Sequence, residues 1–423
     1  YLALHPYVRR PGPESDYHIQ VPMEWGADTS ELVQMLKKGH YGVKLDAEAF
    51  DRLYTWIDLN VPCHGTWTEH RGNIEKIVAR RLEMRTKYAN RPENPEVYPT
   101  PPPERGAFVK PEPVPERKPF AEKVAGWPFD AAEAKKRQGA AGLPAELKID
   151  LGDKLTLDLA LVPAGEFVMG SADGYPDEYP QCRVKIDKPF YMGKVEITNQ
   201  QYALFDAAHD SGVISVFNKD HSDRGQHVDR PLQPVVRISW KQATDFCYWL
   251  SQKTGRKFTL PTEAQWEWAA RAGTDTPLYF GDCKADFGKF ANLADARFQE
   301  LCIRDSPKWL PAITSVNDGS IVTDHAGKYG PASANAFGLL DVAGNAAEWT
   351  LSDYKPYPYV AADGREAASD SGRKVARGGS YHDRPFRARS AVRFDYAAWQ
   401  RVHNVGFRVL CDPDGKKVVS AGK

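Results

Sequence analysis

Two histidines and an aspartate near the C-terminal end are the residues of this chain whose types best suit metal chemistry. His382 and Asp383 are adjacent, and His403 follows in the segment RVHNVGF. Two imidazoles and a carboxylate are the ligand set of an open non-haem iron site. Adjacent side chains rarely bind one metal together, and exposed loop histidines are common. The three residues are therefore weak candidates for a catalytic metal site.

Arginines and aromatic side chains surround the same segment. Seven arginines occur between residues 377 and 408, among several aromatic residues. A pocket formed by Tyr381, Arg384, Arg387 and Trp399 would suit a carboxylate, a peptide or a sugar face through bidentate and stacking contacts. Alternatively, the arginines pair with local aspartates and brace the loops.

A second group of candidates contains oxygen ligands. In the segment DVAGNAAEW, Asp341 and Glu348 can supply carboxylates, with the backbone carbonyls of Gly344 and Ala346 between them. Calcium prefers such hard oxygen ligands. The alternative is a network of carboxylates that caps loops without a metal. Either interpretation gives these residues a structural role.

Other motifs with a known chemistry are missing from the sequence. It contains no Cys-x-x-Cys pair, no Gly-x-Ser-x-Gly, no phosphate loop and no His-Glu-x-x-His. Cys247 lies at helical spacing with Phe246 and Leu250, which predicts a core position. Cys283 and Cys302 flank a long irregular segment and would either form a disulfide in an oxidising compartment or remain two thiols.

The composition limits the classes of partner. The 423 residues include 56 Lys and Arg and 56 Asp and Glu, so the net charge gives no argument for binding nucleic acid or an anionic membrane. No apolar run approaches the ~20 residues that span a bilayer. Because the first residue is Tyr1, we expect the chain to start partway through a longer or processed product.

The composition and periodicity of the sequence change three times along the chain. Residues 1–91 carry apolar residues at intervals of three and four, which predicts a helical region in which Asp46 is an N-cap. Residues 92–144 are rich in proline and predict a linker or a strap over another surface. Residues 145–413 alternate short strands and short helices, an α+β pattern with many loops. Residues 414–423 form a C-terminal tail.

Several short helices are predicted within residues 145–413. They are NQQYALFDAAHDSG, WKQATDFCYWLSQKTG and PTEAQWEWAARAG. In the last of these, Thr262 and Gln265 form a capping-box pattern, and the helix is expected to end at Gly273. Glu263 would then lie near the positive end of the helix dipole.

Six segments of this part of the chain occur in an order typical of one family. They are LVPAGEFVMGS, KVEITNQQY, residues 234–273, NAFGLLDVAGNAAEWT, RGGSY and NVGFRV. In these segments the chain resembles the formylglycine-generating enzymes, or sulfatase-modifying factors. The resemblance implies an α+β, loop-rich C-type-lectin-like fold for residues 145–413, often holding calcium.

The resemblance also implies that the family's chemistry is missing. In the active enzymes two cysteines of this segment bind copper, and the corresponding positions here are Asp383 and Ala388. Without a thiolate pair there is no soft ligand set for copper(I) and no thiol to exchange with a substrate cysteine. Tryptophans usual in the family are also replaced, by Ala347 and Tyr381.

Calcium is the cofactor that the resemblance favours. The family uses the positions of Asp341, Gly344, Ala346 and Glu348 for one calcium site. A second family site would correspond to Asn292 and the Leu293 carbonyl with Asp318 and the Ser320 carbonyl. Iron and copper are not expected.

The N-terminal part resembles, more loosely, helical segments of large secreted bacterial proteins related to the hydrazine synthase alpha subunit. Those relatives carry haem-attachment motifs, and this chain has none. Haem is therefore expected only if upstream sequence or a partner supplies it, with His5, His40 or His64 as a distal ligand. This resemblance favours a bacterial product that is periplasmic, secreted or at the cell surface.

Two functions remain open at this point. The first is a non-catalytic, calcium-stabilised binding or assembly module whose helical region docks onto a protein partner or an upstream domain, such as a redox or haem protein. The second is an oxidoreductase that uses non-haem iron or another metal in a remodelled pocket around His382, Asp383 and His403.

Overall fold

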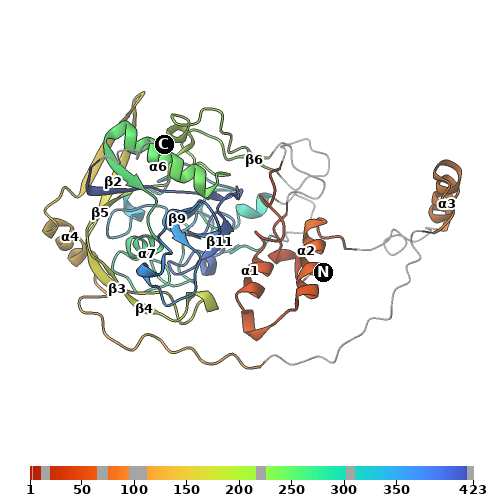
Figure 1. Ribbon diagram of the computed structural model, residues 1–423, viewed down its shortest axis with the longest axis horizontal. Coiled ribbons are helices and arrows are strands. Elements are labelled where there is room, and N and C mark those ends of the chain that lie inside the picture. The colour runs from red at the N-terminus through yellow and green to blue at the C-terminus, as the bar shows by residue number, and fades with distance from the viewer. Residues whose placement is uncertain are drawn as a thin grey trace.

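The computed structural model places a small helical region beside a larger α+β domain (Figure 1). It describes residues 1, 3–10, 20–63, 75–94, 112–215, 225–301 and 310–416. The predicted α+β class with a helical N-terminal region is therefore confirmed. The predicted C-terminal tail lies largely outside the described residues. Cys302, one partner of the possible disulfide, also lies outside them.

The N-terminal region contains helices α1 (Glu31–Lys37), α2 (Ala47–Asp58) and α3 (Glu75–Ala89). Asp46 accepts a hydrogen bond from the Ala49 amide at 2.8 Å, so the predicted N-cap is confirmed. A hydrophobic cluster of its own lies between α1, α2 and the preceding turns, formed by Val8, Ala27, Leu32, Val33, Ile57 and Val61. The region around α1 and α2 is thus a small body with a separate core.

A strap and one helix connect this region to the domain. Residues 112–130 contain no helix or strand and are followed by α4 (Ala131–Ala140). The Arg117 guanidinium donates to the Gly174 carbonyl at 2.9 Å, and the Phe120 amide donates to Gln181 at 3.0 Å. The strap therefore lies on the surface of the domain, fixed by polar contacts to the loop that contains Gly174.

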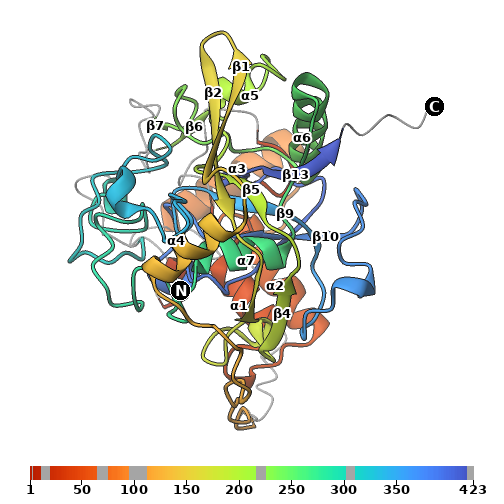
Figure 2. The same ribbon diagram turned by 90° about the vertical axis from the view of Figure 1, so that its left-hand side faces the viewer.

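The domain contains two main sheets and two small ones. One sheet has five antiparallel strands in the order β1-β2-β5-β13-β8, and Figure 2 shows several of these strands with α4 in front of them. A four-stranded sheet has the order β11-β10-β9-β12, in which β12 runs parallel to β9. The strands are β1 (Glu146–Gly152), β2 (Leu155–Val162), β3 (Gly165–Met169), β4 (Cys182–Ile186), β5 (Phe190–Gly193), β6 (Val213–Ile214), β7 (Gln226–His227), β8 (Arg256–Thr259), β9 (Ala347–Asp353), β10 (Arg373–Arg377), β11 (Phe394–Ala397), β12 (Val405–Gly406) and β13 (Leu410–Lys416).

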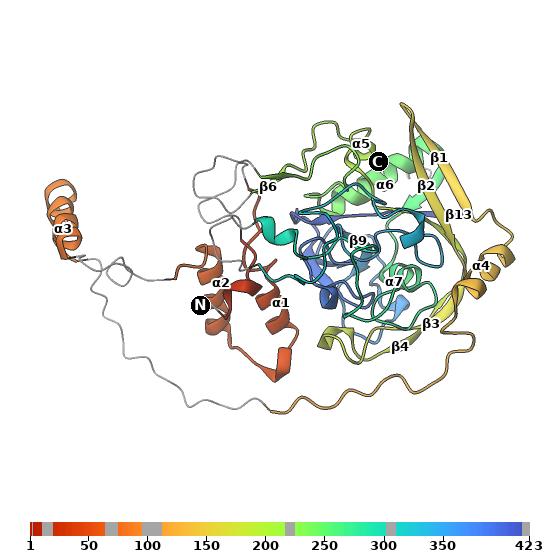
Figure 3. The same cartoon turned by 180° about the vertical axis from the view of Figure 1, so that it is seen from behind.

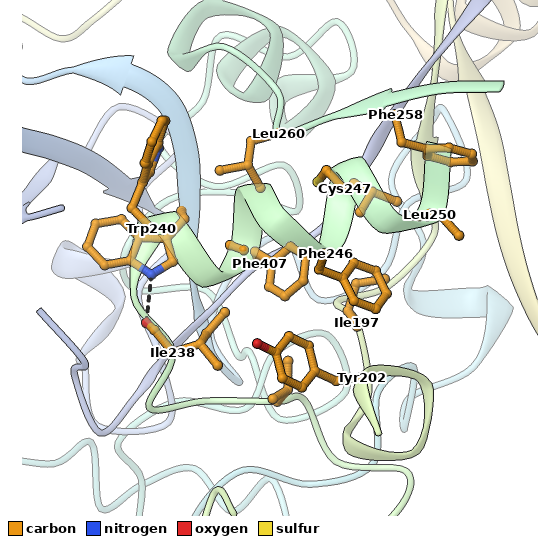
Figure 4. Packing of buried hydrophobic residues seen from close by; sticks show 14 of the residues in the cluster. Ile197, Tyr202, Ile238, Trp240, Phe246, Cys247, Leu250, Phe258, Leu260 and Phe407 are labelled. Atoms are coloured by element: carbon orange, nitrogen blue, oxygen red, sulfur yellow. Dashed lines mark hydrogen bonds between the residues drawn. The ribbon is translucent and has the colours of Figure 1, made fainter. Parts of the chain in front are cut away.

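Helix α6 (Trp240–Thr254) supplies one side of the largest core. Its residues Phe246, Cys247 and Leu250 are buried, and the Phe246 ring lies 5.5 Å from Tyr202 and 5.4 Å from Phe407 (Figure 4). The predicted core position of Cys247 is confirmed. This core joins the helix to both main sheets.

Helix α7 (Glu263–Arg271) begins at the predicted capping box. The Gln265 amide donates to the Thr262 hydroxyl, and the Thr262 amide donates to the Gln265 side chain at 2.9 Å. The helix ends two residues before Gly273, because Ala272 already adopts a left-handed φ of 45°. Gly273 follows with a φ of 101°, and a Cβ there would lie 2.4 Å from Phe129.

The helix predicted to start at Asn199 is shorter than expected. Helix α5 spans only Asn199–Tyr202. The Asp206 carboxylate accepts from the Ala208 amide at 3.1 Å, which closes a local turn in place of a continued helix. Among the described helices, none is long and apolar enough to cross a membrane.

Short 3-10 helices complete the connections. They are η1 (His5–Tyr7), η2 (His40–Gly42), η4 (Pro176–Glu178), η5 (Phe298–Leu301), η6 (Pro331–Ser333), η7 (Ala361–Asp363) and η8 (Pro385–Arg387).

The cap of α7 gives a first prediction. Thr262→Ala removes one half of the capping box and is expected to lower the free energy of unfolding by about 1 kcal/mol. Urea unfolding followed by circular dichroism measures this loss. Thr86→Ala on the exposed α3 is the control, since its hydroxyl contacts only the Leu82 carbonyl of its own helix. An equal loss in both variants would contradict the role of the cap.

Candidate functional site

The segment that joins β10 to β11 is held at both ends by one carboxylate. Glu263, the first residue of α7, pairs with Arg377 at 2.8 Å and with Arg393 at 2.6 Å, and all three side chains are fully buried. Burial alone would raise the pKa of Glu263, but Arg393 and Arg377 hold it below its ordinary value. The segment 377–393 therefore begins and ends at the N-terminus of α7.

Two glycines allow the segment to turn back on itself. Gly378 and Gly379 have φ values of 91° and 69°. A Cβ on Gly379 would lie 3.0 Å from the Cα atom of Ala388. The chain at Ala388 therefore packs directly on the Gly379 turn, and Ala388 itself is buried in a hydrophobic cluster with Leu293 and Ala343.

Asp383 is buried in a network of donors. Its carboxylate accepts from Arg9 at 2.5 Å, from Arg387 at 2.8 Å, and from the Ser380 amide and hydroxyl at 3.0 and 2.9 Å. Burial opposes ionisation, yet Arg9 and Arg387 hold the pKa of Asp383 well below its usual range. The carboxylate is therefore ionised at neutral pH and is bound by two guanidiniums.

The two candidate histidines lie next to each other. Their ring centroids are 5.8 Å apart, and His403 stacks on Trp25 at 3.6 Å. Burial, reinforced by Arg9, lowers the pKa of His382 to about 3. Burial and the same arginine hold the pKa of His403 well below its ordinary value. Both rings are therefore neutral at neutral pH.

The structure brings His382, Asp383 and His403 together, but their contacts do not favour a metal ion. The two Asp383 oxygens accept from arginines and Ser380, and positive guanidinium groups lie beside both rings. In the part of the chain that the structure describes, no three His, Cys, Asp or Glu side chains form a group that could hold a metal. These residues do not fit an iron or copper centre.

The proposed pocket residues fall into different environments. Arg384 pairs with Glu31 at 3.1 Å, and Arg387 donates to Gln34 at 2.8 Å. Tyr381 is buried, whereas Trp399 is 56% exposed. Arginines thus brace this part of the structure, and many of their partners come from the distant N-terminal region.

Helix α1 and the chain before it contact the segment, and Figure 3 shows α1 beside the domain. Further contacts join Glu24 to Arg237 at 2.5 Å, Asp28 to Arg373 at 3.1 Å and Lys38 to Asp177 at 3.0 Å. The contacts of Arg9, Glu24, Trp25, Asp28, Glu31, Gln34 and Lys38 were not anticipated from the sequence. The charges of these residues do not indicate their partners in the sequence, because each partner lies more than 130 residues away.

The first set of calcium candidates forms a buried carboxylate cluster. Glu348 pairs with Arg408 through two contacts of 2.6 Å and accepts from Trp266 at 2.7 Å. Burial raises the pKa of Asp341 to about 6. Burial and the nearby Asp341 raise the pKa of Glu196 well above its ordinary value. One arginine thus faces several carboxylates.

The residues of the second set lie close to one another. The Leu293 and Ser320 amides donate to Asp318 at 2.9 and 2.8 Å, which joins residues 292–293 to 318–320. Burial, with Asp295 nearby, raises the pKa of Asp318 to about 7. The buried oxygens Asn292 Oδ1 and Glu196 Oε2 have no hydrogen-bond partner. Excess carboxylates and unpartnered oxygens fit a hard cation such as calcium.

The fold and the site define a loop-rich α+β domain whose central segment is clamped by buried arginines. The family described as "Sulfatase-modifying factor enzyme 1-like domain" matches residues 153–413. This is more than half of the chain, which therefore belongs to that family.

Similar proteins include a formylglycine-generating enzyme and a relative named inactive. The formylglycine-generating enzyme of Streptomyces coelicolor is 29% identical over 300 residues, which cover 60% of this chain and 88% of that protein. The inactive C-alpha-formylglycine-generating enzyme 2 of Bos taurus is 27% identical, covering 62% and 90%. The structure of PvdO from Pseudomonas aeruginosa has 26% identity and a TM-score of 0.49, covering 63% and 98%.

His382 and His403 predict a pH dependence. Since their folded pKa values are lowered, the unfolded chain binds protons below pH ~6.5 that the folded protein excludes. Stability is therefore lost as the pH falls, by about 2 kcal/mol between pH 7 and pH 5 for His382 alone. Comparing urea unfolding at the two pH values for the native protein and His382→Phe isolates this contribution.

The comparison needs an exposed histidine as its control. His325→Asn suits this purpose, because His325 lies at the surface beside Asp324. The stability difference between pH 7 and pH 5 should shrink in His382→Phe and stay unchanged in His325→Asn. The same difference in all three proteins would show that His382 is protonated in the folded state.

Proposed function

We propose that this protein is a non-catalytic member of its family, a binding or assembly module stabilised by calcium that works within a larger exported complex. The observation that carries the proposal is the environment of Asp383 and Ala388. The resemblance places the copper-binding cysteines of active enzymes at these positions. Here one is an anion bound by Arg9 and Arg387, and the other is a buried methyl group.

This environment lacks what the family's oxidation needs. Neither side chain supplies a soft ligand for copper(I), and neither can exchange with a thiol. The N-terminal region also lies over the segment, so a substrate would have to displace it. A bovine relative that is named inactive supports the idea that the fold persists without the chemistry.

Calcium would act here as a structural ion. The carboxylates of Asp341 and Glu348 with the carbonyls of Gly344 and Ala346 would hold one ion. Asn292 and Asp318 with the carbonyls of Leu293 and Ser320 would hold another. A bound cation offsets the repulsion between buried carboxylates, so it would stabilise loops that contain little regular structure.

The rest of the proposal concerns the partner and the location. A protein partner, such as a redox or haem protein, would bind the module, and export to the periplasm or the cell surface would bring the two together. The loose resemblance of the N-terminal region to secreted haem proteins supports this part.

Elemental analysis of the purified, unstripped protein tests the proposal. Calcium near stoichiometry without iron or copper is the expected result. Stoichiometric iron or copper would contradict it and favour the alternative, a metal-dependent oxidoreductase built around His382, Asp383 and His403.

The effect of calcium on stability gives a sharper prediction. Asp341→Asn removes one carboxylate but leaves the Glu348–Arg408 pair intact, and asparagine tolerates the φ of 53° at this position. We expect the variant to lose the rise in melting temperature that calcium gives the native protein. In chelator it should be as stable as the native protein or more so, because a buried like charge is removed.

Asp153→Asn is the matched control. Asp153 also has a left-handed φ, of 50°, but it lies exposed in the turn between β1 and β2. The control should respond to calcium as the native protein does. If Asp341→Asn keeps the full calcium response, residue 341 is not a ligand.

A further inference from the structure

One face of the domain presents four arginines to the N-terminal region. We call Arg237, Arg373, Arg384 and Arg387 the arginine face, and residues 24–34 the acidic segment. Arg237 binds Glu24 at 2.5 Å, Arg373 binds both oxygens of Asp28 at 3.1 Å, and Arg384 binds Glu31 at 3.1 and 3.2 Å. Arg387 donates to Gln34 at 2.8 Å.

The spacing of the partners suits a continuous ligand. Glu24, Asp28, Glu31 and Gln34 follow one another at intervals of four, three and three residues. Side chains at these intervals share one side of a helical or turn-rich segment. One short stretch of chain thus contacts all four arginines, as a bound peptide would.

Apolar contact between the two bodies is limited. The N-terminal region has its own hydrophobic cluster. Of its described residues, Trp25 alone belongs to a buried cluster that includes domain residues. In two further ion pairs the basic residue belongs to the N-terminal region and the acidic residue to the domain. Arg9 pairs with Asp383, and Lys38 pairs with Asp177. An interface dominated by charge pairs favours specific recognition, and an inter-domain interface with little apolar contact allows relative motion of the two bodies.

Arg237 and Arg384 find their carboxylate partners in the acidic segment, whereas Arg373 also pairs with Asp395 at 2.5 Å and Arg387 with Asp383 at 2.8 Å. Arg237 and Arg387 are buried, so an acidic group close to each guanidinium offsets the cost of its burial. Guanidinium groups bind carboxylates in paired, directed contacts, as Arg373 and Arg384 do here. A peptide with carboxylates at similar spacing has the chemistry to take the same place.

We propose that the arginine face is a binding site for an acidic peptide segment of a partner protein, and that residues 24–34 fill it as a displaceable internal ligand. The proposal rests on the binding function proposed above and names the chemistry of the partner. Residues 24–34 belong to the same chain as the arginine face, so the internal ligand is covalently tethered to its site. A covalent tether can give an effective concentration on the order of millimolar, against which a free peptide competes weakly.

A labelled synthetic peptide with the sequence of residues 20–38 tests this in the full-length protein. Fluorescence anisotropy is measured with the native chain and with Glu24→Gln/Asp28→Asn/Glu31→Gln, in which the internal ligand is neutralised. We expect the peptide to bind the variant roughly tenfold or more tightly than the native chain. Binding should weaken at raised ionic strength and disappear when the peptide carries the same three substitutions.

The matched control neutralises acidic residues that point away from the interface. Glu48→Gln/Asp51→Asn/Glu83→Gln changes the net charge by the same amount at exposed positions. It should bind the peptide as weakly as the native chain does. Adding Arg384→Gln to the first variant should weaken the binding of the peptide again.

Hydrogen exchange of the amides of residues 381–403 is measured together with peptide binding, so that each combination of results supports or overturns the proposal. Faster exchange in the interface variant with peptide binding supports the proposal. Unchanged exchange would show that the ion pairs do not hold the segment, and faster exchange without peptide binding would show that the face is no receptor; either result overturns it.

Two further points keep the test clear. If the triple variant fails to fold, Glu31→Gln alone gives the same comparison, because its partner Arg384 is 29% exposed and stays hydrated. The peptide result does not depend on the bound metal. Iron in the elemental analysis would therefore refute the non-catalytic function without deciding the peptide site, and failure of peptide binding would leave the calcium result standing.

Discussion

The buried pairing of Glu263 with Arg377 and Arg393 is the interaction on which the rest of the site depends. These three side chains join the start of α7 to both ends of the segment 377–393. Removing one partner of such a pair leaves an uncompensated buried charge, at a cost of roughly 3–5 kcal/mol. A segment with only one short 3-10 helix thereby keeps a defined shape.

A similar arrangement recurs on the neighbouring strand β9, where Glu348 lies opposite Arg377 of β10. Arg408 binds Glu348 and also donates to the carbonyls of Gly193 and Leu340 at 3.0 Å. Long guanidinium side chains thus replace the backbone ladders that a loop-rich fold lacks. The carboxylates gathered around Arg408 outnumber it, and this imbalance is the physical basis for proposing calcium there.

The same physical chemistry ties the segment to the N-terminal region. A buried aspartate needs positive neighbours, and Arg9 and Arg387 provide them for Asp383. Because Arg9 belongs to the N-terminal region, Asp383 joins that region to the segment. A position that the resemblance associates with chemistry is here part of an interface.

The sequence by itself determined the local features of this protein. Asp46, Thr262 with Gln265, and the periodic apolar residues of α6 act over three or four residues, so their roles follow from spacing alone. Ordered motifs likewise identified the family. Only the tertiary structure decided that Glu24, Asp28 and Glu31 bind Arg237, Arg373 and Arg384. The order of charges along a chain does not show which of them pair. Which opposite charges meet depends on how the two bodies, each with its own core, pack together.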